Sequence, residues 1–244
     1  MKGSQLLVVV VFAACLSSGP PSYAQAPRPG PAAATTEVRQ AISAARKEIE
    51  TYKAAGGASA TTDHPAIKWD AALWAYRERH PRSESAALAS AEAVRLLFRA
   101  ELWDRAHARV ESVAFDDPAW ERLATPIYEA GIARNDLPGT IAALSRAAAA
   151  TSSPSIKAAV LVVVGRAYRR HGDNAAATRS LETAKSTAPG TPYAEEAEGV
   201  LYEIKYLSVG VQAPPISGRT RNAGMIEPAA LRGKPVVLVF WGST

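Results

Sequence analysis

The spacing of apolar residues changes along the chain and divides it into two regions. From Thr36 to about Leu207, Ala, Leu, Arg and Glu recur at the interval of amphipathic helices, and strand-like alternation is scarce. Val236 to Trp241 instead forms a continuous apolar run, which is typical of a strand buried on both faces. The pattern therefore predicts a mainly α chain with strands near its C-terminal end.

One stretch of the helical region carries an ordered set of small, aromatic and turn residues. Gly165 is small enough for two antiparallel helices to touch there, and Tyr168 follows three residues later. Gly172 suits the left-handed position that ends a first helix, and Ala177 lies on the second. The unit extends from Leu161 to Pro189 and includes Asp173, Leu181 and Ala184. This pattern resembles a tetratricopeptide repeat.

Weaker copies of this unit lie upstream. Thr140 and Ala106 occupy the place of Ala177, at successive intervals of 37 and 34 residues, which fit the repeat length. Prolines recur at similar intervals along this series of units, at Pro118, Pro154 and Pro189. The resemblance therefore implies several successive helical hairpins rather than one.

Further helices are expected on both sides of these hairpins. The segments 37–55 and 66–79 predict an opening pair, and Thr191 predicts the N-cap of a closing helix that ends near Leu207. Residues 37–207 are thus expected to form a tetratricopeptide-like helical-hairpin array. Its tryptophans are expected mainly in the core, at Trp69, Trp74, Trp103 and Trp120.

Such an array has an inner face that often binds a peptide or a partner protein. The alternative is a plain helical spacer that positions the following domain, since fold alone does not carry function. The residues of the helical region leave both interpretations open.

The C-terminal residues carry a second resemblance. Val209-Gly210-Val211-Gln212-Ala213-Pro214 is a lead-in, Gly224 is the candidate turn of a short hairpin, and Leu231-x-Gly233-Lys234-Pro235 leads into the apolar run. In order and spacing these residues resemble the thioredoxin-like redoxin family, especially exported TlpA-type thiol–disulfide oxidoreductases and their AhpC/TSA relatives. The alternative is a core strand of some other α/β domain.

The resemblance implies where the active site would lie. Phe240, Trp241, Gly242, Ser243 and Thr244 match the family's active-site flank, so a nucleophilic cysteine is expected immediately after Thr244. Residues 208–244 would then be the N-terminal part of a truncated thioredoxin-like domain. The intact parent would exchange thiols and disulfides with a protein partner, or reduce peroxides. The rival interpretation is a non-enzymatic tetratricopeptide-like scaffold or envelope lipoprotein.

Cysteine content limits what this chain can do alone. Dithiol exchange needs an attacking thiolate and a resolving thiol, and Cys15 is the only cysteine in the sequence. No catalytic residue is therefore expected within the chain, and no cofactor.

The N-terminus resembles an export signal. Lys2 precedes the apolar stretch Leu6–Leu16, and Ala24-Gln25-Ala26 offers a cleavage site, so residues 1–26 are assigned to a signal peptide. Residues 27–36 form a Pro- and Ala-rich linker. Alternatives are lipidation at Cys15 or an uncleaved membrane anchor. The expected location is a bacterial periplasm or cell envelope, with membrane contact only through such an anchor.

Composition excludes several other functions. The chain is 48% hydrophobic and 21% charged, and its net charge of +5 is spread along it, which disfavours nucleic-acid binding. Its histidines are isolated, so no metal site is expected; they are His64, His80, His107 and His171. The helix start at Glu195, Glu196 and Glu198 indicates compensation of the helix dipole rather than an acid–base pair.

Overall fold

The computed structural model describes residues 8–13, 36–212, 214, 218–219, 225–226, 233 and 236–241. The chain divides into two compact units, one formed by Ala26–Lys205 and the other by Met1–Gln25 together with Tyr206–Thr244. Cys15, Gly224 and residues 242–244 lie outside the described residues.

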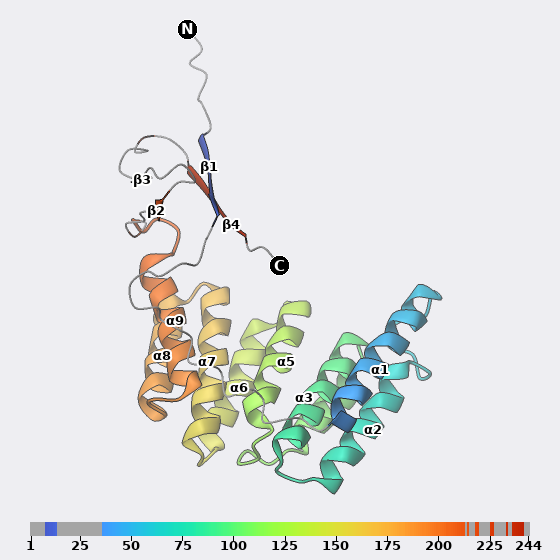
Figure 1. The fold of residues 1–244 in the computed structure, drawn as a ribbon. Coiled ribbons are helices and arrows are strands. Elements are labelled where there is room, and N and C mark those ends of the chain that lie inside the picture. The colour runs from blue at the N-terminus through green and yellow to red at the C-terminus, as the bar shows by residue number, and fades with distance from the viewer. Residues whose placement is uncertain are drawn as a thin grey trace. The chain divides into compact units, whose positions relative to one another are not determined.

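The described residues are mainly helical, as the sequence predicts (Figure 1). The helices are α1 (Thr36–Ala54), α2 (Pro65–Arg79), α3 (Glu84–Arg99), α4 (Trp103–Glu111), α5 (Trp120–Ala133), α6 (Leu137–Ala150), α7 (Pro154–His171), α8 (Asn174–Thr187) and α9 (Pro192–Tyr206). The expected opening pair and closing helix are therefore present, within one or two residues of their predicted bounds.

Most successive helices of the unit pack against one another. α1 packs on α2, α2 on α3, α6 on α7 and α7 on α8. The odd-numbered helices α1, α3, α5 and α7 also form a second series, in which each contacts the next. Each added hairpin therefore buries its apolar face against the preceding one, which is how stacked helical repeats form a continuous core.

The unit from Leu161 to Pro189 folds as its pattern predicts. An ideal Cβ on Gly165 would lie 2.6 Å from Leu181 Cγ, so α7 and α8 touch at this glycine. Gly172 ends α7 with a left-handed φ of 94°, which glycine adopts without steric cost. The Asp173 carboxylate then accepts the Ala176 N–H at 2.8 Å and caps α8.

The same close approach recurs one hairpin earlier. A Cβ on Gly131 would lie 1.9 Å from Thr140 Oγ1, so α5 and α6 also meet at a glycine. Gly131 and Gly165 are 34 residues apart. Thr140 was identified from the sequence and Gly131 was not, although the 34-residue spacing from Gly165 was sufficient to find it.

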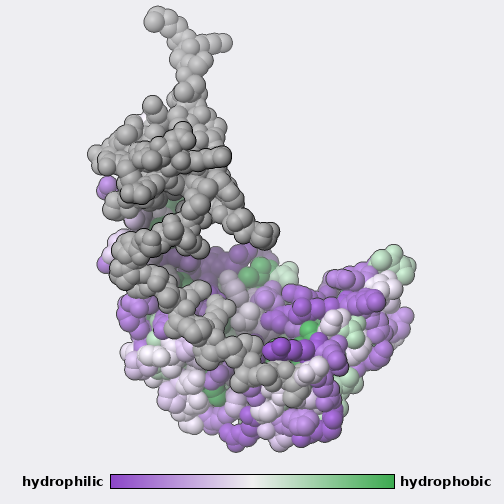
Figure 2. Space-filling model, viewed as in Figure 1, coloured by the Kyte–Doolittle hydropathy of each residue, from purple (hydrophilic) through white to green (hydrophobic). Residues whose placement is uncertain are grey.

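Apolar side chains fill the core, and the face of the helical unit visible in Figure 2 is largely hydrophilic where it is coloured. Among the tryptophans, Trp74 and Trp120 are buried, as expected. Trp69 and Trp103 are only half-buried, because the Trp69 indole N–H reaches outward to Glu48 at 2.8 Å and Trp103 borders a pocket.

Short strands belong to the other unit. β4 (Val236–Trp241) is a strand, as predicted, and it pairs in parallel with β1 (Val8–Ala13) in the register Val8 to Val236. β2 (Gly218–Arg219) pairs antiparallel with β3 (Met225–Ile226). The expected burial of both faces of β4 is wrong at Val237, which is 46% exposed. Within the described residues β1 is its only strand partner.

No helix within the described residues has the length and apolar character needed to cross a membrane.

We predict opposite effects from two glycine-to-alanine changes in helices. Gly199→Ala in α9 meets open space and should stabilise the chain by about 0.5–1 kcal/mol through helix propensity. Gly165→Ala should instead destabilise it by about 1–2 kcal/mol, because the methyl group clashes with the buried Leu181. Urea denaturation measures both, and equal effects would disprove the close helix contact.

A second prediction concerns His64, which caps α2. Its Nδ1 accepts the Ala66 N–H at 3.1 Å, its side chain is 2% exposed, and burial lowers its pKa below the ordinary value. Below about pH 6.5 the imidazole is therefore protonated to a greater extent in the unfolded state than in the folded state. The free energy of unfolding should then decrease as the pH is lowered, by up to about 1.4 kcal/mol per pH unit.

The control is His64→Asn, which keeps a capping side chain without a titratable group. Thermal melts between about pH 7.5 and pH 5.5 should show the wild type losing stability relative to this variant. Parallel pH profiles for the two proteins would contradict the assignment.

Candidate functional site

The structure describes only some of the residues that were predicted to flank an active site. Phe240 and Trp241 form the end of β4. Gly242, Ser243 and Thr244, and the candidate lipidation residue Cys15, lie outside the described residues. Among the described residues no three His, Cys, Asp or Glu side chains gather as metal ligands.

The glutamates of α9 do more than compensate its dipole. Glu196 forms an ion pair with Arg166 of α7 at 2.6 Å, and Glu198 forms one with Lys185 of α8 at 3.2 Å. Of the three, only Glu195 lies in the first turn of α9, where its charge compensates the helix dipole as expected. Ion-pair partners on other helices are not visible in a single helix's sequence, which is why this role was missed.

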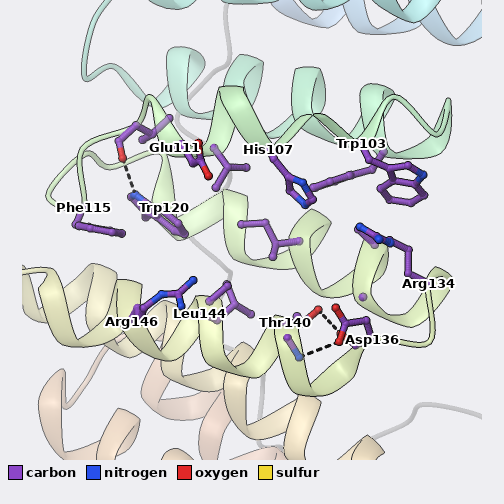
Figure 3. Close-up of a pocket in the computed structure, with 18 of the residues that line it drawn as sticks. Trp103, His107, Glu111, Phe115, Trp120, Arg134, Asp136, Thr140, Leu144 and Arg146 are labelled. Atoms are coloured by element: carbon purple, nitrogen blue, oxygen red, sulfur yellow. Dashed lines mark hydrogen bonds between the residues drawn. The ribbon is translucent and has the colours of Figure 1, made fainter. Parts of the chain in front are cut away.

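The main candidate site is a pocket of about 510 Å³ beside α4, α5 and α6 (Figure 3). α4 lies along one side with Trp103, His107 and Glu111, and α6 lies along the other with Thr140, Leu144 and Arg146. Side chains of α5 form the floor between them. We call this pocket the α4–α6 groove.

The α4–α6 groove arises from an interruption in the stacking. Within the described residues α4 packs on α3 and makes little contact with α5, whereas α2 packs closely on α3 and α6 on α7. α4 is short and buries only Ala106 fully. The connection to α5, residues 112–119, is longer than the connections 80–83 and 151–153 at the other junctions. α4 is therefore free to stand away from α5.

A buried carboxylate draws α4 toward α2 instead. The Asp70 side chain is completely buried, and it accepts hydrogen bonds from Arg109 at 2.8 and 3.1 Å and from Arg105 at 3.1 Å. The Arg109 guanidinium also lies 4.4 Å from the centroid of the Trp74 ring. Both arginines belong to α4, so this cluster fixes the helix on the side away from the groove.

The connection after α4 is fixed by two further carboxylates. The Asp117 carboxylate accepts a hydrogen bond from the Arg77 guanidinium at 2.7 Å. Burial alone would raise the pKa of Asp117, but the hydrogen bonds from Arg77 and from the Ala119 N–H hold this pKa below its ordinary value. Asp116 accepts the Ser152 N–H at 2.7 Å, which lowers its pKa. These contacts attach the connection to α2 at one point and to the α6–α7 turn at the other.

The groove surface is apolar and partly aromatic. Phe98 lies 5.6 Å from the rings of both Trp103 and His107, and Phe115 lies 5.6 Å from Trp120. Phe115 is 43% exposed, which is unusual for so large an apolar side chain. Other apolar contributors to the lining are Val110, Ile127, Ala130 and Leu144.

Charged groups lie on the rim of the groove. Arg134 caps α5 and stacks 5.0 Å from the centroid of Trp103. Arg146 projects from α6 at the opposite end (Figure 3). The Asp136 carboxylate accepts the Gly139 N–H at 2.9 Å and so serves as the N-cap of α6. Apolar walls with a few polar groups suit the binding of a ligand.

A second, shallower hollow lies between α1 and α2. It is bordered by Tyr52, Trp69 and Glu48, whose pKa is lowered first by the hydrogen bond from Lys68 and then by that from Trp69. Because Glu48 is already engaged by these two donors, the hollow offers fewer free groups than the α4–α6 groove.

Comparison with known proteins adds no assignment, because no protein-family model, curated protein or solved structure matches the chain.

We predict that Asp70→Asn loosens α4. The amide keeps the shape but loses the charge-assisted bonds to Arg105 and Arg109, so the free energy of unfolding should fall by about 2 kcal/mol. Glu182→Gln, at an exposed position of α8, removes the same charge and should change it by less than about 0.5 kcal/mol. Chemical denaturation compares them, and equal stabilities would exclude a structural role for Asp70.

Proposed function

We propose that the chain is the helical part of an exported thioredoxin-like redoxin protein, in which a tetratricopeptide-like array docks a partner protein and a separate module carries the thiol chemistry. The α4–α6 groove is the observation that carries the docking role. It is an apolar pocket whose position is fixed by the Asp70 cluster, and its aromatic rim includes the exposed Phe115.

The hairpin geometry supports the tetratricopeptide-like part of the proposal. Gly131 and Gly165 mark equivalent helix contacts 34 residues apart, and both are followed by a second helix of the hairpin. Contacts along the odd-numbered helices join successive hairpins in the way expected of a stacked array.

The docking site that we propose is bordered by the second helices of two successive hairpins, α4 and α6, with α5 beneath them.

The redox part of the proposal is supported by the residues around β4. A strand occupies Val236–Trp241, where the family places the strand that leads to the active-site turn. A cysteine just after Thr244 would stand at the start of a helix in that family, where free N–H groups and the helix dipole lower a thiol's pKa. The array would then supply a docking site for the protein that exchanges thiols and disulfides with this cysteine.

The rival proposal is a non-enzymatic scaffold or envelope lipoprotein, anchored through Cys15. It uses the same groove, because docking does not require the redox module. The residues that follow Thr244 distinguish the two proposals.

The codons after Thr244 test the redox proposal. Cys-x-x-Cys there should give a longer protein that reduces insulin disulfides, and a single cysteine should give one that consumes hydrogen peroxide. The present chain should reduce neither substrate above background, because Cys15 is its only cysteine. Absence of any cysteine in the following residues would favour the scaffold, and turnover by the present chain would overturn the assignment of the nucleophile.

A further inference from the structure

The α4–α6 groove carries two arginines that no carboxylate of the described residues pairs. Arg134 stacks on Trp103, and Arg146 makes no hydrogen bond or ion pair with another described residue. Nearby arginines behave differently, since Arg95 pairs with Glu129 at 3.1 Å and Arg122 pairs with Glu84 at 2.8 Å. The two groove arginines are thus available to an incoming ligand.

The acidic groups of the groove, Glu111 and Asp136, form no ion pair with these arginines. Asp136 is engaged with the Gly139 N–H at the start of α6, where the positive end of the helix dipole offsets its charge. Glu111, in the last turn of α4, makes no ion pair with another described residue. Arg134 and Arg146 lie at opposite ends of the groove, so a bound ligand would meet one positive charge at each end (Figure 3).

We infer that the groove binds an extended protein segment in which apolar side chains stand between two carboxylates. This inference rests on the proposed docking role and specifies its partner. The apolar centre would cover Ile127, Leu144 and Phe115, and each carboxylate would pair with one arginine. Charge complementarity of this kind selects a partner and its orientation.

The helix geometry fixes the spacing of the carboxylates. Arg146 lies nine residues beyond Leu137, where α6 begins, which at about 1.5 Å per residue is roughly 14 Å along the helix axis, and Arg134 lies near the Asp136 end of the groove (Figure 3). An extended segment advances about 3.3 Å per residue, so its two carboxylates should be about four residues apart. In a strand, residues at this spacing point to the same side as the residue midway between them.

The experiment uses three labelled peptides and the chain as it exists. The acidic probe is fluorescein-Gly-Glu-Leu-Phe-Leu-Glu-Gly amide, and the other two replace both glutamates with glutamine or with lysine. Fluorescence anisotropy at low salt should show the acidic probe binding at least about tenfold more tightly than the lysine probe. This preference should shrink when the salt is raised to about 0.5 M, because ions screen exposed charges.

Charge reversals assign the preference to the two arginines. Arg134→Glu and Arg146→Glu should each weaken binding of the acidic probe by about three- to tenfold, and the double variant should prefer the lysine probe. Arg179→Glu is the matched control, because it makes the same charge change on an exposed part of α8 and should leave binding unchanged. Circular dichroism checks that all the variants keep their helices.

The outcomes separate this inference from the proposals on which it rests. Equal binding of all three probes would overturn the role of the arginines and leave the groove as an apolar docking site. Binding of none of them would overturn both the inference and the docking role. An equal loss in the Arg179→Glu control would show that net charge acts instead of the groove. The codons after Thr244 test the redox module independently of all three results.

Discussion

The interaction on which the candidate site depends is the buried contact of Asp70 with two arginines of α4. A fully buried carboxylate is costly to remove from water, so its partners must hold good geometry, and Arg109 does so while stacked on Trp74. The contact holds a short helix that buries little apolar surface of its own. Because α4 is held toward α2, the surface of α5 beside it stays uncovered, and the groove is the result.

Local features were well predicted from the sequence because they depend on neighbouring residues. The helix segments, the end of α7 at Gly172 and the capping by Asp173 follow from 3.6-residue periodicity and from turn chemistry. The strand at Val236–Trp241 follows from its apolar run. The burial expected for this strand was wrong because burial depends on what packs against it, and β1 as its partner could not be read from its residues.

The groove could not be predicted, because it depends on contacts between helices far apart in the sequence. Asp70 and Arg109 are charged residues on different helices, and nothing local indicates that they meet in the interior. The connection before α5, residues 112–119, was one available signal, since it is longer than the connections before α3 and α7. Arg134 and Arg146 are likewise ordinary surface arginines until the helices bring them to the ends of one pocket.

The separation of α4 from α5 also bears on how cooperatively the helical unit unfolds. In stacked arrays, cooperativity passes only through nearest-neighbour interfaces. Here the block α1–α4 joins the block from α5 onward mainly through α3 and α5, with ion pairs such as Arg122 to Glu84 beside them. This junction between hairpins relies on fewer helix pairs than the junctions at α2–α3 and α6–α7, so we expect the unit to separate into these two blocks when it begins to melt.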